Sequence, residues 1–285
     1  MFGPKLPYVM SDCDGTIVNH DLTIAKETIA AILKYQKQSG YRFAFCTGRL
    51  DVANRQLARQ LKVQLPIVAC NGALITDLKT NEVLYADYLD SQICATIFRE
   101  CHKLKIDMIA YVPGAMVGTK TSHRLQVWQR YQEQITNQAD KWPIHFYDDL
   151  EKLASAIEQK QVCPVELTMY CEDQNKLKQA LAMLAAYDQS IDVVQSLPTM
   201  FNVMNKGTNK LTGLIRWAEI VQTNYQEVIV FGDNHNDLAM VEGVFKGIAV
   251  GNAVDELKTK AYKVCETIDN NGVGKELERL VATNG

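Results

Sequence analysis

The chain has 285 residues, of which 47% are hydrophobic and 22% are charged, and its formal net charge is −3. This length accommodates one large globular domain or two modest ones. The slightly negative charge argues against a broad nucleic-acid-binding surface, and no run approaches the roughly 18 apolar residues of a membrane helix, so we expect neither partner.

The first part of the chain alternates short apolar runs with helical patterns. Ile29, Ile32 and Leu33 recur at helical spacing, and Gly40 is a natural end for that helix. A second helix is expected at residues 51–61. Strands are expected around and between these helices, in the runs PYVMSD, RFAFCTG and PIVACNG. This order predicts a parallel sheet with helices on its faces.

The next part of the chain has a different character. The segment ALITDLKTNEVLYADYL predicts a hairpin with its turn at residues 79–81. Farther on, the chain has helices of its own in the runs SQICATIFRECHKL and EDQNKLKQALAMLAAY. It also has strands of its own around IDMIAYV and PVELTMYC. Residues 129–141 are polar and show no clear pattern.

After Pro198 the pattern of the first part returns, with a helix in KLTGLIRWAEI and strands in EVIVFGD and FKGIAVGN. The sequence therefore predicts an α/β fold, a doubly wound and mainly parallel Rossmann-like core sheet with an inserted α/β domain. The core would comprise residues 1–86 and 198–285, and the insert residues 87–197. Hinges are expected near residues 87–88 and 196–198.

The eight cysteines are scattered, with no CxxC pair, and several lie inside apolar runs. A chain of this size does not need disulfides for stability, so we expect reduced, buried thiols. The short apolar run before Asp12 does not resemble a signal peptide. Together these features predict a cytoplasmic protein.

Four polar motifs follow predicted core strands or open a helix beside them. They are Asp12-Cys13-Asp14-Gly15-Thr16, Thr47-Gly48-Arg49, Lys210, and GDNHND with Asp233 and Asp237. Open α/β sheets bind ligands at the carboxyl ends of their strands, so the motifs are expected to meet there. Taken alone, each motif has a plainer explanation. Asp12 could simply form a turn, Arg49 and Lys210 could be solvent-exposed cations, and GDNHND could be a polar turn. GDNHND lacks the ligand spacing of an EF-hand calcium loop.

Together, the four motifs supply the groups that phosphoryl transfer needs. Clustered carboxylates require a cation, and hard oxygen ligands suit Mg²⁺. An ionised Asp can act as a nucleophile, while a second acid two residues further on can transfer protons. Lys210, Thr47 and the N–H groups near Gly48 would hold the phosphoryl oxygens.

The ordered set DxDGT, Thr-Gly-Arg, Lys and GDxxND resembles the signature of the haloacid dehalogenase superfamily of phosphatases. The segments NGALI (residues 71–75) and GIAVGNAVDELKTKAYKVCETIDNNGVGKEL (residues 247–277) are similar to those of its Cof-type sugar-phosphatase branch. The resemblance covers both core sections and the position of the insert. It implies a Mg²⁺-dependent phosphomonoesterase that hydrolyses a small phosphorylated metabolite, such as a sugar phosphate, through an aspartyl-phosphate.

The resemblance also implies a role for each matching position. Asp12 would be the nucleophile, and Asp14 would protonate the leaving oxygen and then activate water. Arg49 would reach the organic part of the substrate. Phosphate would be bound by Thr47, Gly48, Lys210 and Asn236. The metal site would use the side chains of Asp12 and Asp233 and the backbone carbonyl of Asp14, with Asn234 and Asp237 contributing to it or supporting it.

Two positions depart from the family pattern. Cys13 stands where a larger aliphatic residue is frequent, and we expect it to pack rather than to carry redox chemistry. Lys210 is followed by Leu211 where Gly is common, which leaves Lys206 as a competing phosphate-binding residue.

In this branch the insert is a cap that closes over the site and contacts the leaving group. Candidate specificity residues are Lys120, His123, Arg124 and Trp128, for which solvated surface or cap packing is the alternative. A hexose phosphate, another small phosphate ester, flavin mononucleotide or pyridoxal phosphate would all be suitable substrates. We expect a monomer or a homodimer.

Two other functions use similar residues. A phosphomutase or phosphotransferase would pass the phosphoryl group on, but its relatives usually carry a smaller helical cap earlier in the chain. A receiver-like signalling protein also combines acids, a Thr and a Lys at strand ends. Receivers, however, are far smaller and lack both GDxxND and a cap-sized insert.

Overall fold

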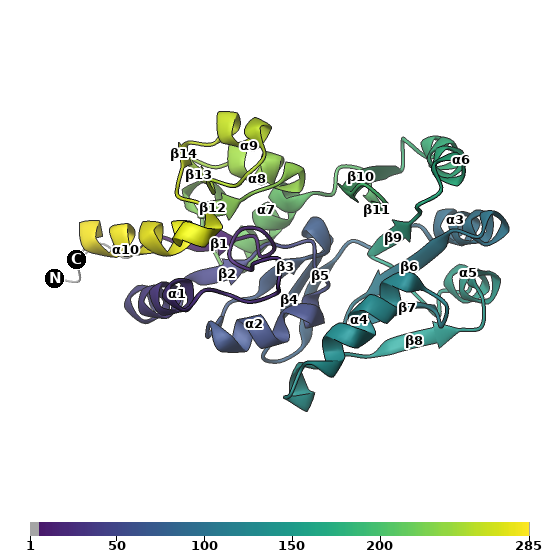
Figure 1. The fold of residues 1–285 in the computed structure, drawn as a ribbon, viewed down its shortest axis with the longest axis horizontal. Helices are drawn as coiled ribbons and strands as arrows, with labels where there is room; N and C mark the ends of the chain where they lie inside the picture. Colours follow the sequence, from purple (N-terminus) through teal and green to yellow (C-terminus); the bar gives the residue numbers. More distant parts are fainter. Residues whose placement is uncertain (1–5, 285) are drawn as a thin grey trace. The chain divides into compact units, whose positions relative to one another are not determined.

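The computed structural model describes residues 6–284, and the chain forms two compact units (Figure 1). The first unit contains the residues up to Arg49, Asn54–Leu84 and the chain from Asn209 on. The second contains Leu50–Ala53 and Tyr85–Thr208. The outermost ends of the two expected core sections, and the first residues on which the signal-peptide expectation rests, lie outside the described residues.

The first unit is built on a parallel sheet in the order β14-β13-β12-β1-β2. Its strands are β1 (Val9–Ser11), β2 (Phe43–Phe45), β12 (Ile229–Gly232), β13 (Lys246–Ala249) and β14 (Lys263–Val264). Every residue of β1, β2 and β12 is buried, because helices cover both faces of the sheet. This explains why these strands read as continuous apolar runs rather than as alternating patterns. The predicted fold class is confirmed.

A second, three-stranded sheet continues from β2. A parallel bridge joins Cys46 to Val68, and the sheet then runs β3-β4-β5. Its strands are β3 (Ile67–Ala69), β4 (Leu74–Asp77) and β5 (Glu82–Ala86), so the predicted third strand and hairpin are confirmed.

Helices lie on both faces of the parallel sheet (Figure 1). On one side, α1 (Lys26–Ser39) packs against α10 (Gly272–Asn284); on the other, α7 (Lys210–Ile220) packs against α8 (Leu238–Glu242). Helix α1 ends as expected, with Gly40 in the left-handed conformation. The expected helix at residues 51–61 is divided into a 3₁₀ turn, Asp51–Asn54, and α2, Arg55–Gln60. Such a turn is common at the start of an α-helix. A further short helix is α9, Asp255–Lys260.

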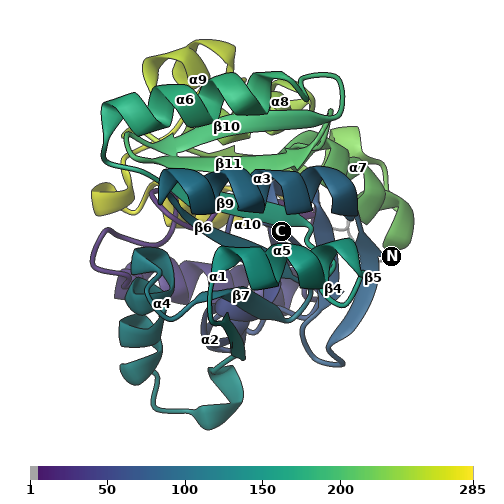
Figure 2. The same cartoon turned by 90° about the vertical axis from the view of Figure 1, so that its right-hand side faces the viewer.

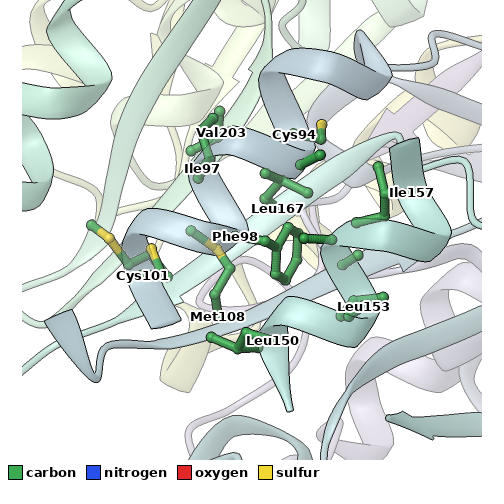
Figure 3. Close-up of a cluster of buried hydrophobic side chains, with 14 of the residues drawn as sticks. Cys94, Ile97, Phe98, Cys101, Met108, Leu150, Leu153, Ile157, Leu167 and Val203 are labelled. Atoms are coloured by element: carbon green, nitrogen blue, oxygen red, sulfur yellow. The ribbon is translucent and has the colours of Figure 1, made fainter. Parts of the chain in front are cut away.

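The second unit is built on a six-stranded sheet in the order β10-β11-β9-β6-β7-β8. Its strands are β6 (Asp107–Val112), β7 (Ala115–Thr119), β8 (Ile144–Tyr147), β9 (Glu166–Tyr170), β10 (Ile191–Leu197) and β11 (Met200–Asn205). Figure 2 shows three helices in front of one face of this sheet: α3 (Ser91–Leu104), α5 (Leu150–Glu158) and α6 (Gln174–Ala185). Their apolar sides enclose the core cluster of Figure 3, which includes Phe98, Leu153 and Leu167.

Two features of the second unit differ from the sequence interpretation. The unclear stretch 129–141 contains the end of α4 (His123–Glu133) and a 3₁₀ turn at Gln138–Asp140. The expected boundary between residues 197 and 198 falls in the tight connection between β10 and β11, which pair along their length. Because a hairpin does not divide between two compact bodies, the second unit continues to Thr208.

The eight cysteines are free, and six of them are buried. Between residues 6 and 284, no helix combines the length and apolar character needed to cross a membrane.

Candidate active site

Asp12 follows β1 at the point where the strand order of the parallel sheet reverses. From β1 the chain moves outward to β2, whereas β12, on the other side, continues to β13. The backbone N–H of Asp12 donates to the carbonyl of Phe231 in β12 at 2.9 Å. The residue is only 6% exposed. The acid therefore lies where open α/β sheets bind ligands, in surroundings that withhold water.

The turn after Asp12 brings the chain close to Asp233. Gly15 has a φ of +80°, and its N–H donates to the carbonyl of Val18 at 2.9 Å. A Cβ atom at Gly15 would lie 2.3 Å from Oδ2 of Asp233. Thr16 Oγ1 donates to the other carboxylate oxygen, Oδ1, at 2.9 Å. Glycine and threonine of the first motif thus position an acid from the fourth.

Lys210 joins the first motif to the fourth. Its Nζ donates to Oδ1 of Asp12 and to Oδ1 of Asp237, each at 2.6 Å, and its side chain is fully buried. Lys210 begins α7, and the preceding Asn209 caps that helix with its side chain. Burial by itself would lower the pKa of Lys210, but the charges of Asp12 and Asp237 outweigh it and raise that pKa. The ammonium group therefore stays charged.

Asp237 is fixed from both sides. Its Oδ1 accepts from Lys210, and its Oδ2 accepts the backbone N–H groups of Asp233 and Asn234, at 2.9 Å and 3.1 Å. A Cβ atom at Gly232 would lie 2.5 Å from Cβ of Asp237, so only glycine fits there. With both oxygens engaged, Asp237 shapes the GDNHND loop and holds Lys210.

Three carboxylates meet beside Lys210. Ligand atoms of Asp12, Asp233 and Asp237 lie within 4.8 Å of one another. Burial raises the pKa of Asp12 well above its usual range, although the charge of Lys210 opposes it, and burial together with the charge of Asp237 raises the pKa of Asp233 to about 6. Three carboxylates and one ammonium leave an excess of two negative charges when all are ionised. A divalent cation with a preference for oxygen ligands, such as Mg²⁺, fits this donor set and charge.

The second motif positions the other acid of the first. Arg49 lies in the loop after β2, and its backbone N–H donates to Thr47 Oγ1 at 3.1 Å. Its guanidinium donates to both oxygens of Asp14, from Nε at 2.7 Å and from Nη2 at 2.5 Å. The sequence interpretation directed Arg49 to the organic part of the substrate, whereas here its partner is Asp14. The two acids of the first motif are therefore bound by different cationic side chains, Asp12 by Lys210 and Asp14 by Arg49.

Asn71 is a site residue to which the sequence interpretation assigned no role. Its Oδ1 accepts from Nδ2 of Asn236 at 3.0 Å, and a Cβ atom on Gly48 would lie 3.0 Å from the same oxygen. Asn71 and Cys70 have φ values of +52° and +48°, a left-handed backbone that non-glycine residues rarely adopt. The sequence feature that could have indicated a role for Asn71 is its place at the start of the NGALI segment, shortly after the strand β3.

The remaining candidates lie as follows. Asn234 is exposed, and its side-chain oxygen accepts from the N–H of His235 at 2.8 Å. Lys206 belongs to the second unit, where its Nζ donates to Asp192 at 2.8 Å, so the buried lysine of the carboxylate cluster is Lys210. The thiol of Cys13 is buried and contacts Oδ1 of Asn54 at 3.8 Å, and burial raises its pKa, which suits a packing role.

Comparison with known proteins identifies the family. The model of the haloacid dehalogenase-like hydrolases matches residues 9–277, nearly the whole chain. The chain belongs to this family. Within it, the protein is a Cof-type phosphatase, as the resemblance of residues 71–75 and 247–277 to that branch predicts. The match to a hydrolase family also disfavours the receiver-like alternative.

Curated relatives cover most of the chain. It is 26% identical over 252 residues to the pyridoxal phosphate phosphatase YbhA of Escherichia coli, covering 88% of this chain and 89% of the relative. It is 27% identical over 284 residues to the 5-amino-6-(5-phospho-D-ribitylamino)uracil phosphatase YwtE of Bacillus subtilis, covering 95% and 96%.

Solved structures share the fold at lower identity. A haloacid dehalogenase-like hydrolase from Bacteroides thetaiotaomicron superimposes with a TM-score of 0.81 at 22% identity, covering 97% of this chain and all of that one. The subclass IIB sugar phosphatase BT4131 gives a TM-score of 0.75 at 19% identity, covering 96% and 99%. At these identities the likeness supports the fold alone.

Proposed function

We propose that this phosphatase is a Mg²⁺-dependent phosphomonoesterase that forms an aspartyl-phosphate on Asp12. One observation carries the proposal: two acids, two residues apart, are held by different cations in different surroundings. Asp12 is buried against Lys210 beside Asp233, while the side chain of Asp14 is 52% exposed and paired with Arg49. Such a separation suits one acid to nucleophilic attack and the other to proton transfer.

In the first step, an oxygen of Asp12 attacks phosphorus, and the bond from phosphorus to the ester oxygen breaks. Asp14, carrying a proton, delivers it to the departing oxygen, which leaves as an alcohol. In the second step, Asp14 takes a proton from water, whose oxygen attacks the phosphorus of the aspartyl-phosphate. The acyl phosphate bond breaks, inorganic phosphate leaves, and Asp12 is regenerated as a carboxylate.

The phosphoryl oxygens would be bound by Thr47, the N–H groups near Gly48, Lys210 and Asn236. Lys210 supplies positive charge from a fully buried position, where charge interacts more strongly than in water. The contact between Asn71 and Asn236 holds one of these donors toward the loop that contains Gly48. These groups need little reorganisation when charge builds up on the phosphoryl group.

Magnesium would be held by the side chains of Asp12 and Asp233 and the backbone carbonyl of Asp14, with Asp237 fixing the loop around it. When bound, the cation would supply positive charge to the phosphoryl oxygens and keep Asp12 ionised. The raised pKa values of Asp12 and Asp233 and the two excess negative charges support a divalent cation there.

The substrate is proposed to be a small phosphorylated metabolite, such as a sugar phosphate. Two relatives are named as phosphatases of pyridoxal phosphate and of 5-amino-6-(5-phospho-D-ribitylamino)uracil, and these small phosphate esters support a substrate of similar size. The second unit would be the cap. The cytoplasmic location and the monomeric or homodimeric state stay predictions.

The test is phosphate release from a panel of phosphorylated metabolites, with Mg²⁺ and with EDTA. Release should require Mg²⁺ and should vanish in Asp12→Asn, while circular dichroism shows an intact fold. Retained release in Asp12→Asn would remove the proposed nucleophile. Equal release with EDTA would remove the metal.

A further inference from the structure

The specificity candidates of the second unit pack against their own neighbours. His123 stacks on Tyr170 with ring centroids 4.5 Å apart, and the guanidinium of Arg124 lies 5.0 Å from the ring of Trp128. Trp128 also contacts Trp142 edge-on, at 5.7 Å between centroids. These contacts describe packing within the second unit and single out no ligand.

In the first unit, the segment after β13 lies against the motif that contains Asp233. The N–H of Val250 donates to the carbonyl of Gly232 at 3.1 Å, and the N–H of Val254 donates to the carbonyl of Asp233 at 2.9 Å. Strands β13 and β12 are parallel neighbours in the sheet, so the chain leaves both of them at the same edge (Figure 1). The main chain of Asp233 is therefore held by residues 250–254, to which the sequence interpretation assigned no role.

Asn252, within this segment, joins remote parts of the chain through its side chain. Its Nδ2 donates to the carbonyl oxygen of Gly15 at 2.8 Å, across 237 positions in the sequence. Its Oδ1 accepts from the N–H of Ile268 at 2.9 Å. A reversed amide would lose both hydrogen bonds, so the side chain has one orientation. Asn252 thus ties the segment after β13 to the turn of the first motif and to the turn before α10.

The carbonyl that Asn252 holds belongs to the peptide group between Gly15 and Thr16. The N–H of Thr16, on the other side of the same peptide group, donates to the carbonyl of Cys13 at 3.3 Å. Because both its oxygen and its N–H are bonded, this peptide group has little freedom to rotate. The turn that follows Asp12 is therefore fixed partly by Asn252.

Two contacts between that turn and Asp233 lie on either side of the same peptide group. Thr16 Oγ1 donates to Oδ1 of Asp233 at 2.9 Å, and Gly15 leaves the space in which Oδ2 lies. A rotation of the peptide group would move both the hydroxyl of Thr16 and the backbone of Gly15 relative to the carboxylate. The position of that carboxylate thus depends on Asn252 through a contiguous series of contacts.

We propose that Asn252 is a positioning residue for the metal site, holding the Gly15–Thr16 peptide group and, through it, the side chain of Asp233 in position to bind Mg²⁺. The inference rests on the proposed function, in which Asp233 is a metal ligand. Groups that orient the ligands of a metal typically change its affinity by about 10- to 100-fold when they are lost. Asn252 acts one contact farther away, through a single exposed hydrogen bond to Gly15, so we expect a smaller effect of about 3- to 10-fold.

The test is the affinity of Asn252→Ala for Mg²⁺, measured by isothermal titration calorimetry on the metal-free protein without substrate. The dissociation constant should rise by about 3- to 10-fold relative to the wild type. The Mg²⁺ concentration for half-maximal phosphate release should rise in parallel. An unchanged dissociation constant would overturn the proposed role of Asn252.

Asn224→Ala is the matched control. Asn224 is also exposed, and its side chain accepts from the N–H of Gln226 at 3.1 Å and donates to Glu227 at 3.4 Å. It precedes β12, whereas Asp233 follows that strand, so the two lie at opposite ends of it. Both variants should lower Tm by a similar amount, about 2–4 °C, but only Asn252→Ala should weaken Mg²⁺ binding. An equal weakening in the two variants would show a general loss of stability and would overturn the inference.

A double-mutant cycle tests the route through the turn. Thr16→Val removes the hydroxyl that donates to Asp233 and should itself weaken Mg²⁺ binding. In that background Asn252→Ala should change the dissociation constant by less than about 2-fold, because the contact through which the turn acts is already lost. If the two single effects multiply in full, the residues act independently and the proposed route fails.

Failure of the phosphatase function gives a different result, because calorimetry needs no turnover. If the wild type releases no phosphate but binds Mg²⁺ more tightly than Asn252→Ala does, the inference stands and the proposed function fails. If the wild type releases phosphate and both proteins bind Mg²⁺ equally well, only the inference fails. Absence of Mg²⁺ binding in the wild type would overturn the metal site and this inference with it.

Discussion

Arg49 holds both carboxylate oxygens of Asp14 in its guanidinium fork, at 2.7 Å and 2.5 Å. The two side chains differ in burial, since that of Arg49 is 6% exposed and that of Asp14 is 52% exposed. A buried, planar cation thus orients an acid that remains accessible to water. In the proposed mechanism, this relationship makes Arg49 a residue that positions Asp14 for proton transfer.

The first prediction concerns Arg49→Lys. Lysine keeps the charge but cannot make the two parallel hydrogen bonds, so Asp14 should lose its fixed orientation. We expect kcat to fall by about 10- to 100-fold on phenyl phosphate, whose leaving group needs a proton, and less on p-nitrophenyl phosphate. A rise in KM with unchanged kcat would instead support the role at the organic part of the substrate that the sequence suggested.

The second prediction concerns Lys210→Met. Without the ammonium, Asp12 and Asp237 remain buried without their shared cation, a change that typically costs about 3–5 kcal/mol of stability. Urea unfolding at neutral pH should show this loss, and phosphate release should cease. Adding Asp237→Asn removes one of the uncompensated charges and should recover part of the stability without recovering activity.

Lys206→Met is the matched control for that change. Lys206 also pairs with an aspartate, Asp192, but its side chain is 53% exposed. Exposed ion pairs contribute about 0–1 kcal/mol, so both stability and activity should be nearly unchanged. A larger effect for Lys206→Met than for Lys210→Met would reverse the assignment of the phosphate-binding lysine.

The third prediction concerns Gly15→Ala. The new methyl group would lie 2.3 Å from Oδ2 of Asp233 and must displace that carboxylate. Because displaced ligands typically weaken metal binding by about 10- to 100-fold, the Mg²⁺ concentration for half-maximal activity should rise by about 10-fold or more.

Gly40→Ala controls for backbone strain in that experiment. Gly40 also has a positive φ, +69°, but no atom lies within 4 Å of the added Cβ position. Both substitutions should lower Tm through strain, whereas only Gly15→Ala should change the Mg²⁺ requirement. If the two variants need the same Mg²⁺ concentration, the proposed role of Asp233 as a ligand fails.

The sequence predicted the core sheet well because its strands are buried on both faces. Runs such as Val9–Ser11 and Phe43–Phe45 are buried throughout and mainly apolar, and the polar motifs begin where they end. The second unit was harder to predict. Of its strands, β7, β8, β10 and β11 were not predicted, because their short segments mix polar or small residues with apolar ones and form no continuous apolar run.

The candidate site could be predicted only as far as motifs reveal it. The acids and Lys210 stand at strand and helix ends and are visible as short patterns. The partner of Arg49 was not visible, because side-chain direction in a loop is set by tertiary contacts. The contact of Asn71 with Asn236 joins residues 165 positions apart in the chain, and spacing alone gives no information on it.

The fourth prediction concerns pH and metal binding. Burial and the charge of Asp237 raise the pKa of Asp233 to about 6 in the metal-free protein, above the value near 3.8 of an unperturbed Asp. A raised carboxyl pKa means that the folded state binds the proton more tightly. This group's contribution to stability is therefore full below about pH 4 and is lost as pH rises toward 6.

A bound cation reverses this preference, because it favours the ionised carboxylate and must displace the proton. The apparent affinity for Mg²⁺, measured by isothermal titration calorimetry, should therefore increase between about pH 5 and pH 7, with protons released to the buffer. Asp233→Asn, which carries no charge and no titratable proton at this position, should bind Mg²⁺ weakly and lose most of the pH dependence in this window. The same pH dependence in Asp233→Asn and in the wild type would show that other groups control metal binding.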